Sequence, residues 1–254
     1  MFKLNYFGWL VIFCFFLSPS NLIAQNTSVM IRVQSKDAKF IGSSIGGAQI
    51  IVRDSNTGQI LSEGITKGST GDTEIIMNQP LVRGKQLADD KTAGFIAELD
   101  LTEPVFVTIE AIAPVNKRQA MVKSTTQQWL IPGKNISGDG IVLEIPGFVV
   151  DILSPQTHER IGIDQEIEIM ANVVMMCGCP VTEGGIWDAN QYDVQGIITK
   201  DGGEKTNLKM QVQEKPSTYK GNVKLSTGNY EITVYAFDPQ TGNTGVDKTN
   251  IIIQ

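Results

Sequence analysis

The strict alternation of apolar and polar side chains between Gln165 and Met176 constrains the fold of this chain more than any other feature. Side chains along a β-strand point alternately to the two faces of a sheet, so this pattern predicts a strand with one buried and one solvated face. The apolar positions are Ile167, Ile169, Ala171, Val173 and Met175. Apolar residues three or four apart, as in an amphipathic helix, are almost absent from the chain. We therefore predict an all-β protein.

Further segments with strand composition fall into two groups. The 25 glycines and 10 prolines supply turns between them, and a hydrophobic fraction of 41% is enough for real cores. The pattern breaks at Pro146-Gly147, so we predict two β-sandwich domains in series, residues 25–146 and 147–254, each able to fold alone. Because the connection is short, we expect a fixed orientation between them. The other expected strands cover residues 29–33, 47–54, 59–61, 95–101, 105–113, 129–131, 141–145, 148–153, 192–200, 207–212, 219–225, 229–237 and 246–253.

The first 24 residues have the pattern of a secretory signal peptide. Lys3 precedes an apolar run from Phe7 to Leu17, and small and polar residues follow as far as Ala24. The run is shorter than the roughly 20 apolar residues that a membrane-spanning helix needs, and no later segment is longer. We expect cleavage near Ala24, which removes Cys14 and leaves a mature chain, secreted or periplasmic, without a transmembrane segment.

The overall charge bears on the choice of partners. The chain has a formal net charge of −6 at pH 7. Nucleic acids and anionic membrane surfaces bind proteins through clustered lysine and arginine, and the sequence shows no such cluster. Neither is therefore an expected partner.

The segment from Gly47 to Gly71 has a recurrent turn pattern. It reads Gly-Ala-x-Ile-x-Val-x-Asp, then Thr-Gly, Leu and Gly-x-Thr, and its polar turn between residues 54 and 58 predicts a hairpin. This arrangement resembles the transthyretin-like, carboxypeptidase-regulatory-like modules common in bacterial envelope proteins. The resemblance implies a β-sandwich for residues 25–146 and no particular activity.

A second resemblance lies in residues 227–234, Thr-Gly-Asn-Tyr-Glu-Ile-Thr-Val. The segment resembles the tyrosine corner of immunoglobulin-like domains, which implies that fold for residues 147–254. By this resemblance Tyr230 carries the corner hydroxyl, and Ile232 stands where many such domains have a disulfide cysteine.

The stretch from Met175 to Trp187 contains both cysteines that follow the leader, and three interpretations stay open. If the alternation continues, Cys177 and Cys179 are inert residues of the core. Alternatively the two can form a disulfide, which Gly178 makes geometrically accessible and which would be easily reduced. Thirdly, two thiolates with thioethers from Met175 and Met176 would form a soft metal site that suits Cu(I) better than Zn(II). That hypothesis predicts one Cu(I) per reduced chain.

Other candidate sites have simpler explanations. The polar residues of 238–247 could ligate Ca²⁺, but turn chemistry alone predicts them. The only histidine, His158, is expected in a solvated turn far from the cysteines. Trp129 and Trp187 are expected to fill cores.

No Ser-His-Asp arrangement, phosphate-binding glycine loop or histidine pair occurs in the sequence. We therefore predict a non-enzymatic binding or structural protein that presents loops to a protein or envelope-surface partner. The alternative is a Cu(I)-binding or thiol-redox protein that uses Met175 to Cys179. No other cofactor is expected.

Overall fold

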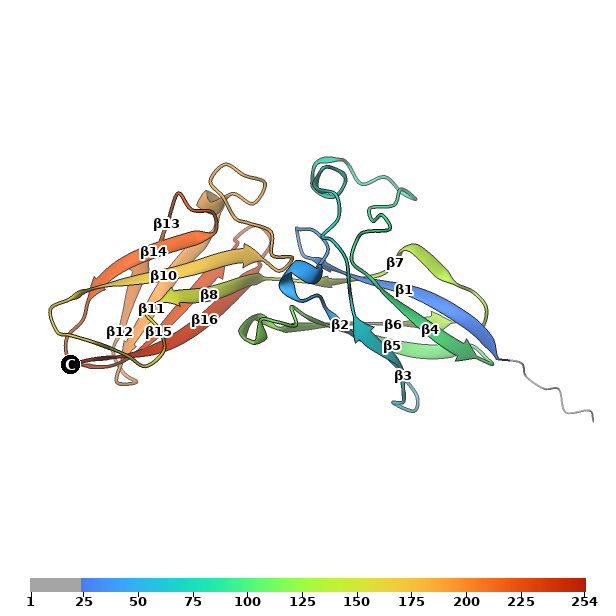
Figure 1. Cartoon of the computed structure of the whole chain (residues 1–254), viewed down its shortest axis with the longest axis horizontal. Coiled ribbons are helices and arrows are strands. Elements are labelled where there is room, and N and C mark those ends of the chain that lie inside the picture. Colours follow the sequence, from blue (N-terminus) through green and yellow to red (C-terminus); the bar gives the residue numbers. More distant parts are fainter. Residues whose placement is uncertain (1–23) are drawn as a thin grey trace, which may run out of the picture.

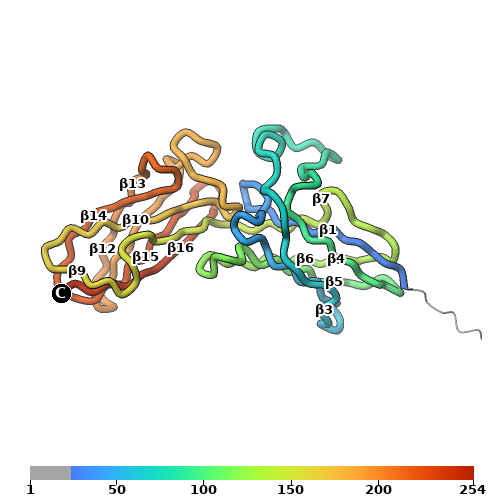
Figure 2. The backbone as a smooth tube through the Cα atoms, in the orientation of Figure 1, coloured from blue at the N-terminus to red at the C-terminus, as the bar shows by residue number. Residues whose placement is uncertain are grey.

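The computed structural model describes residues 24–254, so the predicted signal peptide lies outside the described residues apart from Ala24. The all-β prediction is confirmed. Two β-sandwiches follow one another along the long axis of the molecule (Figure 1), and the trace shows where they meet (Figure 2). β7 ends at Ile145 and β8 begins at Phe148, on either side of Pro146-Gly147. Within residues 24–254 no helix is long and apolar enough to cross a membrane.

The first sandwich packs a three-stranded sheet, in the order β4-β1-β7, against a four-stranded sheet, in the order β3-β2-β5-β6. Its strands are β1 (Gln25–Ser35), β2 (Gln49–Asp54), β3 (Ile60–Ile65), β4 (Phe95–Leu101), β5 (Val105–Ala113), β6 (Val122–Leu130) and β7 (Ile136–Ile145). The odd-numbered residues of β1 face the core, and Val29, Ile31 and Val33 are buried as the alternation predicts. The predicted β2–β3 hairpin is present, and its turn is held by Asp54, whose carboxylate accepts hydrogen bonds from two backbone amides. The transthyretin-like assignment itself stays a prediction.

A bulge in β7 holds the long loop that connects β3 to β4. The register of β1 and β7 shifts between Ile136 and Ile141, and the extra residues include Gly138 and Gly140, both with positive φ. A bulge of this kind redirects a side chain from the strand. Here it turns the carboxylate of Asp139 toward the loop.

The second sandwich packs the sheet β13-β14-β10-β8 against the sheet β12-β11-β15-β16-β9. Its strands are β8 (Phe148–Ser154), β9 (Glu159–Ile161), β10 (Glu166–Met175), β11 (Asp193–Lys200), β12 (Lys205–Lys209), β13 (Gln211–Val212), β14 (Thr218–Lys224), β15 (Gly228–Phe237) and β16 (Thr244–Ile253). Labelled A to G in chain order, with β9 and β12 as the extra strands A′ and C′, these sheets have the immunoglobulin orders A-B-E-D and C′-C-F-G. The domain is therefore an immunoglobulin-like sandwich.

The tyrosine corner lies where the sequence places it, at the start of the F strand, β15. The Tyr230 hydroxyl donates a hydrogen bond of 2.9 Å to the backbone carbonyl of Ser226, four residues upstream. Ile232 is fully buried in the second core, so apolar packing occupies the position of the usual cysteine.

The prediction that both tryptophans fill cores is half wrong. Trp187 is buried, but 59% of Trp129 is exposed. Leu130 occupies the inward position of β6, so its neighbour points to the outer face of the sheet. There Trp129 pairs across the strands with Phe106, with ring centroids 5.2 Å apart.

Candidate functional site

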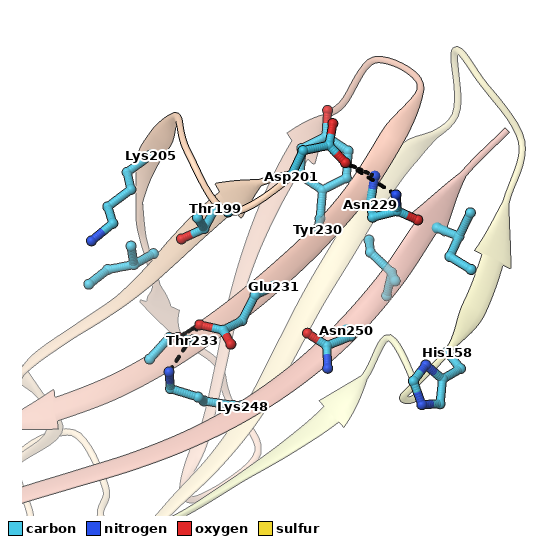
Figure 3. Close-up of a pocket in the computed structure, with 14 residues that line it drawn as sticks. His158, Thr199, Asp201, Lys205, Asn229, Tyr230, Glu231, Thr233, Lys248 and Asn250 are labelled. Carbon is cyan, nitrogen blue, oxygen red and sulfur yellow. Dashed lines mark hydrogen bonds and ion pairs between the residues drawn. The ribbon is translucent and has the colours of Figure 1, made fainter.

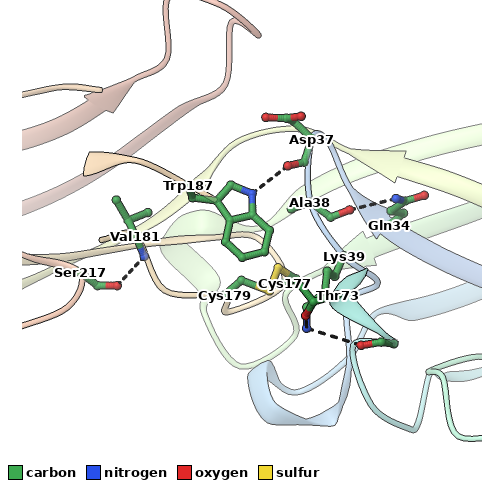
Figure 4. The surroundings of a disulfide bond; sticks show 11 residues. Gln34, Asp37, Ala38, Lys39, Thr73, Cys177, Cys179, Val181, Trp187 and Ser217 are labelled. Carbon is green, nitrogen blue, oxygen red and sulfur yellow. Dashed lines mark hydrogen bonds between the residues drawn. A yellow bond between two sulfur atoms is a disulfide. The ribbon is translucent and has the colours of Figure 1, made fainter. Parts of the chain in front are cut away.

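The stretch that begins at Met175 makes a tight turn at the end of β10, and a disulfide closes it (Figure 4). Cys177 and Cys179 are bonded to each other, with their Cα atoms 5.4 Å apart. Gly178, between them, has a φ of 76° and donates a backbone hydrogen bond of 2.7 Å to the carbonyl of Met175. The left-handed conformation favours glycine at this position. The structure thus contains the cystine of the disulfide interpretation.

The side chains of this turn enter two different cores. Met175, Cys177 and Cys179 pack in the core of the second sandwich, as continued alternation predicts. Met176, on the opposite face, packs in the core of the first sandwich. All four residues are at most 5% exposed. The turn therefore lies at the junction of the two domains.

The proposed metal ligands are thus present, but the two cysteines are oxidised and the two methionines belong to different cores. Within residues 24–254 no group of three or more His, Cys, Asp or Glu side chains is arranged to hold a metal ion. Cu(I) binding would require the disulfide to be reduced first, because thiolates are the ligands that the hypothesis uses. It stays a prediction for the reduced protein.

Trp187, at the far end of the same stretch, connects the domains on this side. Its indole nitrogen donates a hydrogen bond of 2.9 Å to the backbone carbonyl of Asp37, in the turn after β1 (Figure 4). The next residue, Ala38, is buried in the core of the second sandwich. Val149 of β8 is buried in the core of the first. Each domain therefore contributes side chains to the core of the other.

The loop between β15 and β16, considered above for Ca²⁺, connects the domains through Asn243. This side chain is fully buried. Its oxygen accepts a hydrogen bond from the backbone amide of Gly147 at 2.8 Å, and its amide group donates one to the carbonyl of Lys36 at 3.1 Å. The carboxylate of Asp238 accepts bonds from Gln240 and Thr241 in its own turn, as turn chemistry predicts.

The connecting peptide itself is packed. Gly147 has a φ of 115°, and a Cβ there would lie 2.6 Å from the carbonyl oxygen of Thr244. On another side of the junction, Asp151 accepts hydrogen bonds from the Lys117 ammonium at 2.8 Å and from the Gln119 amide at 2.6 Å. Pro146-Gly147 is therefore a fitted connection and not a loose tether.

The junction also gathers negative charge. Asp37 is exposed, but partial burial of its carboxyl raises the pKa, and the nearby carboxylate of Asp238 raises it further, against the opposing effect of Lys36. Burial and the same two carboxylates raise the pKa of the Tyr192 hydroxyl to about 12. Tyr192 packs edge-on against Phe148, with ring centroids 4.9 Å apart. The neighbouring carboxylates thus disfavour the ionised forms of Asp37 and Tyr192.

A second feature, which the sequence did not predict, is an open groove of about 940 Å³ on the outer face of the five-stranded sheet (Figure 3). The Lys248 ammonium and the Glu231 carboxylate form an ion pair of 2.9 Å within it. Asp201 accepts a hydrogen bond from the backbone amide of Asn229. His158, exposed and at a φ of 61°, stands at its edge. The groove thus combines one ion pair with further polar side chains and with apolar ones such as Ile252.

No protein-family model matches the sequence, and comparison with curated proteins gives no significant match. Among solved structures, BcpA, the major pilin subunit of Bacillus cereus, is similar at 10% identity over 90% of this chain and 69% of its own, with a TM-score of 0.34. Clostridium thermocellum CbhA fibronectin(III)-like modules match at 16% identity over 81% of this chain and 77% of theirs, with a TM-score of 0.29. The titin domains z1z2, solved in complex with telethonin, match at 10% identity over 91% and 89%, with a TM-score of 0.25. Similarity at this level carries no argument about function, and the fold class rests on the strand order of the chain itself.

Proposed function

We propose that this chain is a secreted or periplasmic, non-enzymatic protein of the bacterial cell envelope, in which two β-sandwiches form one rigid unit that presents loops to a protein or envelope-surface partner. The observation that supports it best is the reciprocal packing at the junction. Ala38 of the first domain lies in the second core, and Val149 and Met176 of the second domain lie in the first. Domains that share core residues cannot reorient without exposing them, so a partner would meet one fixed surface.

The compartment in this proposal rests on two observations. Residues 1–24 have the pattern of a signal peptide. The Cys177–Cys179 disulfide fits the oxidising conditions of the periplasm or cell exterior, because cytosolic thiols are kept reduced. The presentation of loops rests on the fold, since the loops at the ends of a sandwich carry recognition in many such scaffolds.

To test this proposal, the full chain is expressed in its bacterium, and its cellular compartment and its binding to cell envelopes are measured. We expect a chain cut near Ala24, located outside the cytoplasm, whose two cysteines, in the denatured chain, are blocked to alkylation until they are reduced. Labelled mature protein should then bind isolated cell envelopes saturably, in competition with unlabelled protein. A cytoplasmic chain with free thiols, or binding that does not saturate, would count against the proposal.

A further inference from the structure

The loop between β3 and β4 carries an exposed apolar tip. Leu81 is 78% exposed and Val82 is 60% exposed, the highest values among the large hydrophobic residues of 24–254. Arg83 and Lys85 follow directly and are also exposed. We call residues 81–85 the knob. The loop that carries it projects from the body of the first sandwich (Figure 1).

Hydrogen bonds hold the knob and its base in place. The Lys85 amide donates to the carbonyl of Val82 at 3.0 Å, and the Lys85 ammonium donates to the Gln79 side chain at 2.6 Å. At the base, the Asp139 carboxylate accepts from the backbone amides of Leu87 and Ala88 at 2.8–3.0 Å. A preorganised loop loses less conformational entropy when it binds. The exposed tip is thus held ready for a contact.

A hollow of about 250 Å³ lies next to the knob, on the outer face of the sheet β4-β1-β7. Apolar side chains of Met30, Ile96 and Ile136 line it, and Ile96 is 51% exposed. Two carboxylates from the continuation of the same loop, Asp89 and Asp90, also line it. We call this site the hollow.

The size of the hollow favours a side chain over a small ligand. Sites for small molecules and cofactors usually enclose about 300–1,000 Å³, and the hollow is below that range. One or two aliphatic side chains of a protein would fill it. Such anchors in apolar pockets are the centres of many protein interfaces.

The charges of the knob and the hollow are complementary. The knob carries Arg83 and Lys85, and the hollow carries Asp89 and Asp90. A hydrogen bond from the Thr92 hydroxyl lowers the pKa of Asp89, so this carboxyl is ionised at neutral pH. The guanidinium of Arg32 also lines the hollow, but it is buried and donates to the backbone carbonyls of the loop. The exposed charges of the hollow are therefore negative, opposite to those of the knob.

We propose that the hollow receives the knob of a second copy of this chain, in a two-fold symmetric pair formed by the first domain. The knob and one wall of the hollow belong to the same loop, so a two-fold axis beside it lets each chain insert its knob into the hollow of the other. Leu81 and Val82 contact the apolar lining, and Arg83 faces the carboxylate of Asp90. Because the contact is small, the pair is weak, with a dissociation constant on the order of 0.1 mM.

Sedimentation velocity of the mature protein over a concentration series is the first test. We expect a monomer at low concentration, reversible association as the concentration rises, and weaker association at higher salt. Leu81→Ser combined with Val82→Ser should abolish association without lowering the thermal midpoint, because both side chains are exposed. A wild-type chain that stays monomeric at about 1 mM, or association that this double variant retains, would overturn the proposal.

A charge exchange identifies the occupant of the hollow. Arg83→Glu and Asp90→Lys should each abolish self-association, because each places like charges at both contacts of the pair. Mixing the two variants restores opposite charges at both contacts, so a heterodimer should form. Arg118→Glu and Asp100→Lys, at exposed positions that line neither site, are matched controls that should leave association unchanged. A mixture that remains monomeric would contradict the proposed pairing.

Discussion

Tyr230 shows how one hydroxyl can stabilise a sandwich. Its hydrogen bond of 2.9 Å to the Ser226 carbonyl fixes the chain at the start of β15. Tyr230→Phe removes this bond and retains the ring, so we expect the free energy of unfolding of the second domain to fall by about 1 kcal/mol. Urea denaturation measures the change. Tyr235→Phe on the same strand is the matched control, because its hydroxyl is 3.5 Å from Asp193 and should contribute little. Equal stability of the two variants would contradict the corner assignment.

Asp37 is expected to make the stability of the junction depend on pH. Its pKa is raised in the folded state, first by partial burial and then by Asp238. An acid with a raised pKa favours folding most while protonated, so this contribution is lost as the pH rises through the folded pKa. Asp37→Asn should therefore stabilise the protein at pH 7, with a difference from wild type that vanishes below about pH 4. Asparagine tolerates the positive φ of 56° at this position, so the variant isolates the charge. A melting series over pH checks this expectation.

The two cysteines have distinct expected behaviour in each redox state. In the folded, oxidised protein they should not react with thiol reagents, because they are disulfide-bonded and at most 5% exposed. After anaerobic reduction, the Cu(I) hypothesis predicts one Cu(I) per chain, in preference to Zn(II), and loss of this binding in Cys177→Ala combined with Cys179→Ala. A competition titration decides the matter. If the reduced wild-type protein binds no Cu(I), the two cysteines serve only to hold the turn through their disulfide.

Residues whose surroundings depend on a local pattern could be predicted, whereas residues that contact distant parts of the chain could not. The inward face of Cys177 and Cys179 and the role of Tyr230 follow from alternation and from a short motif. That Met175 and Met176 enter different cores could not be predicted, because it depends on where the first domain lies against the second. Trp129 was misplaced because composition favours burial of tryptophan, whereas its parity on β6 puts it outside.

At the scale of elements, the loop between β3 and β4 depends on the β7 bulge. Asp139→Ala leaves the amides of Leu87 and Ala88 without an acceptor. Hydrogen bonds to charged groups contribute about 1.5–3 kcal/mol, so hydrogen exchange at these two amides should accelerate by about tenfold or more. Asp100→Ala, on the exposed face of β4, is the control. Unchanged hydrogen exchange in Asp139→Ala would show that the Asp139 carboxylate does not hold the loop.

Most strands could be predicted because alternation is a property of the strand itself. β4 and β5 begin and end at the predicted residues, and β10 and β15 deviate by one residue or less at each end. The short strand β9 and the first part of β6 were missed, since they are polar and rely on neighbouring strands for their pairing. The strand predicted at residues 207–212 is divided in the structure into β12 and β13, which belong to different sheets. The bulge of β7 was missed too, although the Gly-Asp-Gly run at residues 138–140 is the signal that could have indicated it.

At the scale of the whole molecule, the sharing of core residues affects what an isolated half can do. A fragment of residues 147–254 lacks Ala38 and exposes Val149 and Met176, and a fragment of residues 25–146 loses the side chains that complete its core. Independent folding of each half stays a prediction, and we expect each fragment to be less stable than the same domain in the intact chain.

The rigid junction is the central claim, and residual dipolar couplings of backbone amides in one alignment medium test it most directly. If the two sandwiches form one body, a single alignment tensor should fit the couplings of residues 25–145 and 148–254 together. Asn243→Ala, which removes the bonds to Gly147 and Lys36, should make the two tensors diverge. Wild-type tensors of clearly different magnitude for the two domains would contradict the account.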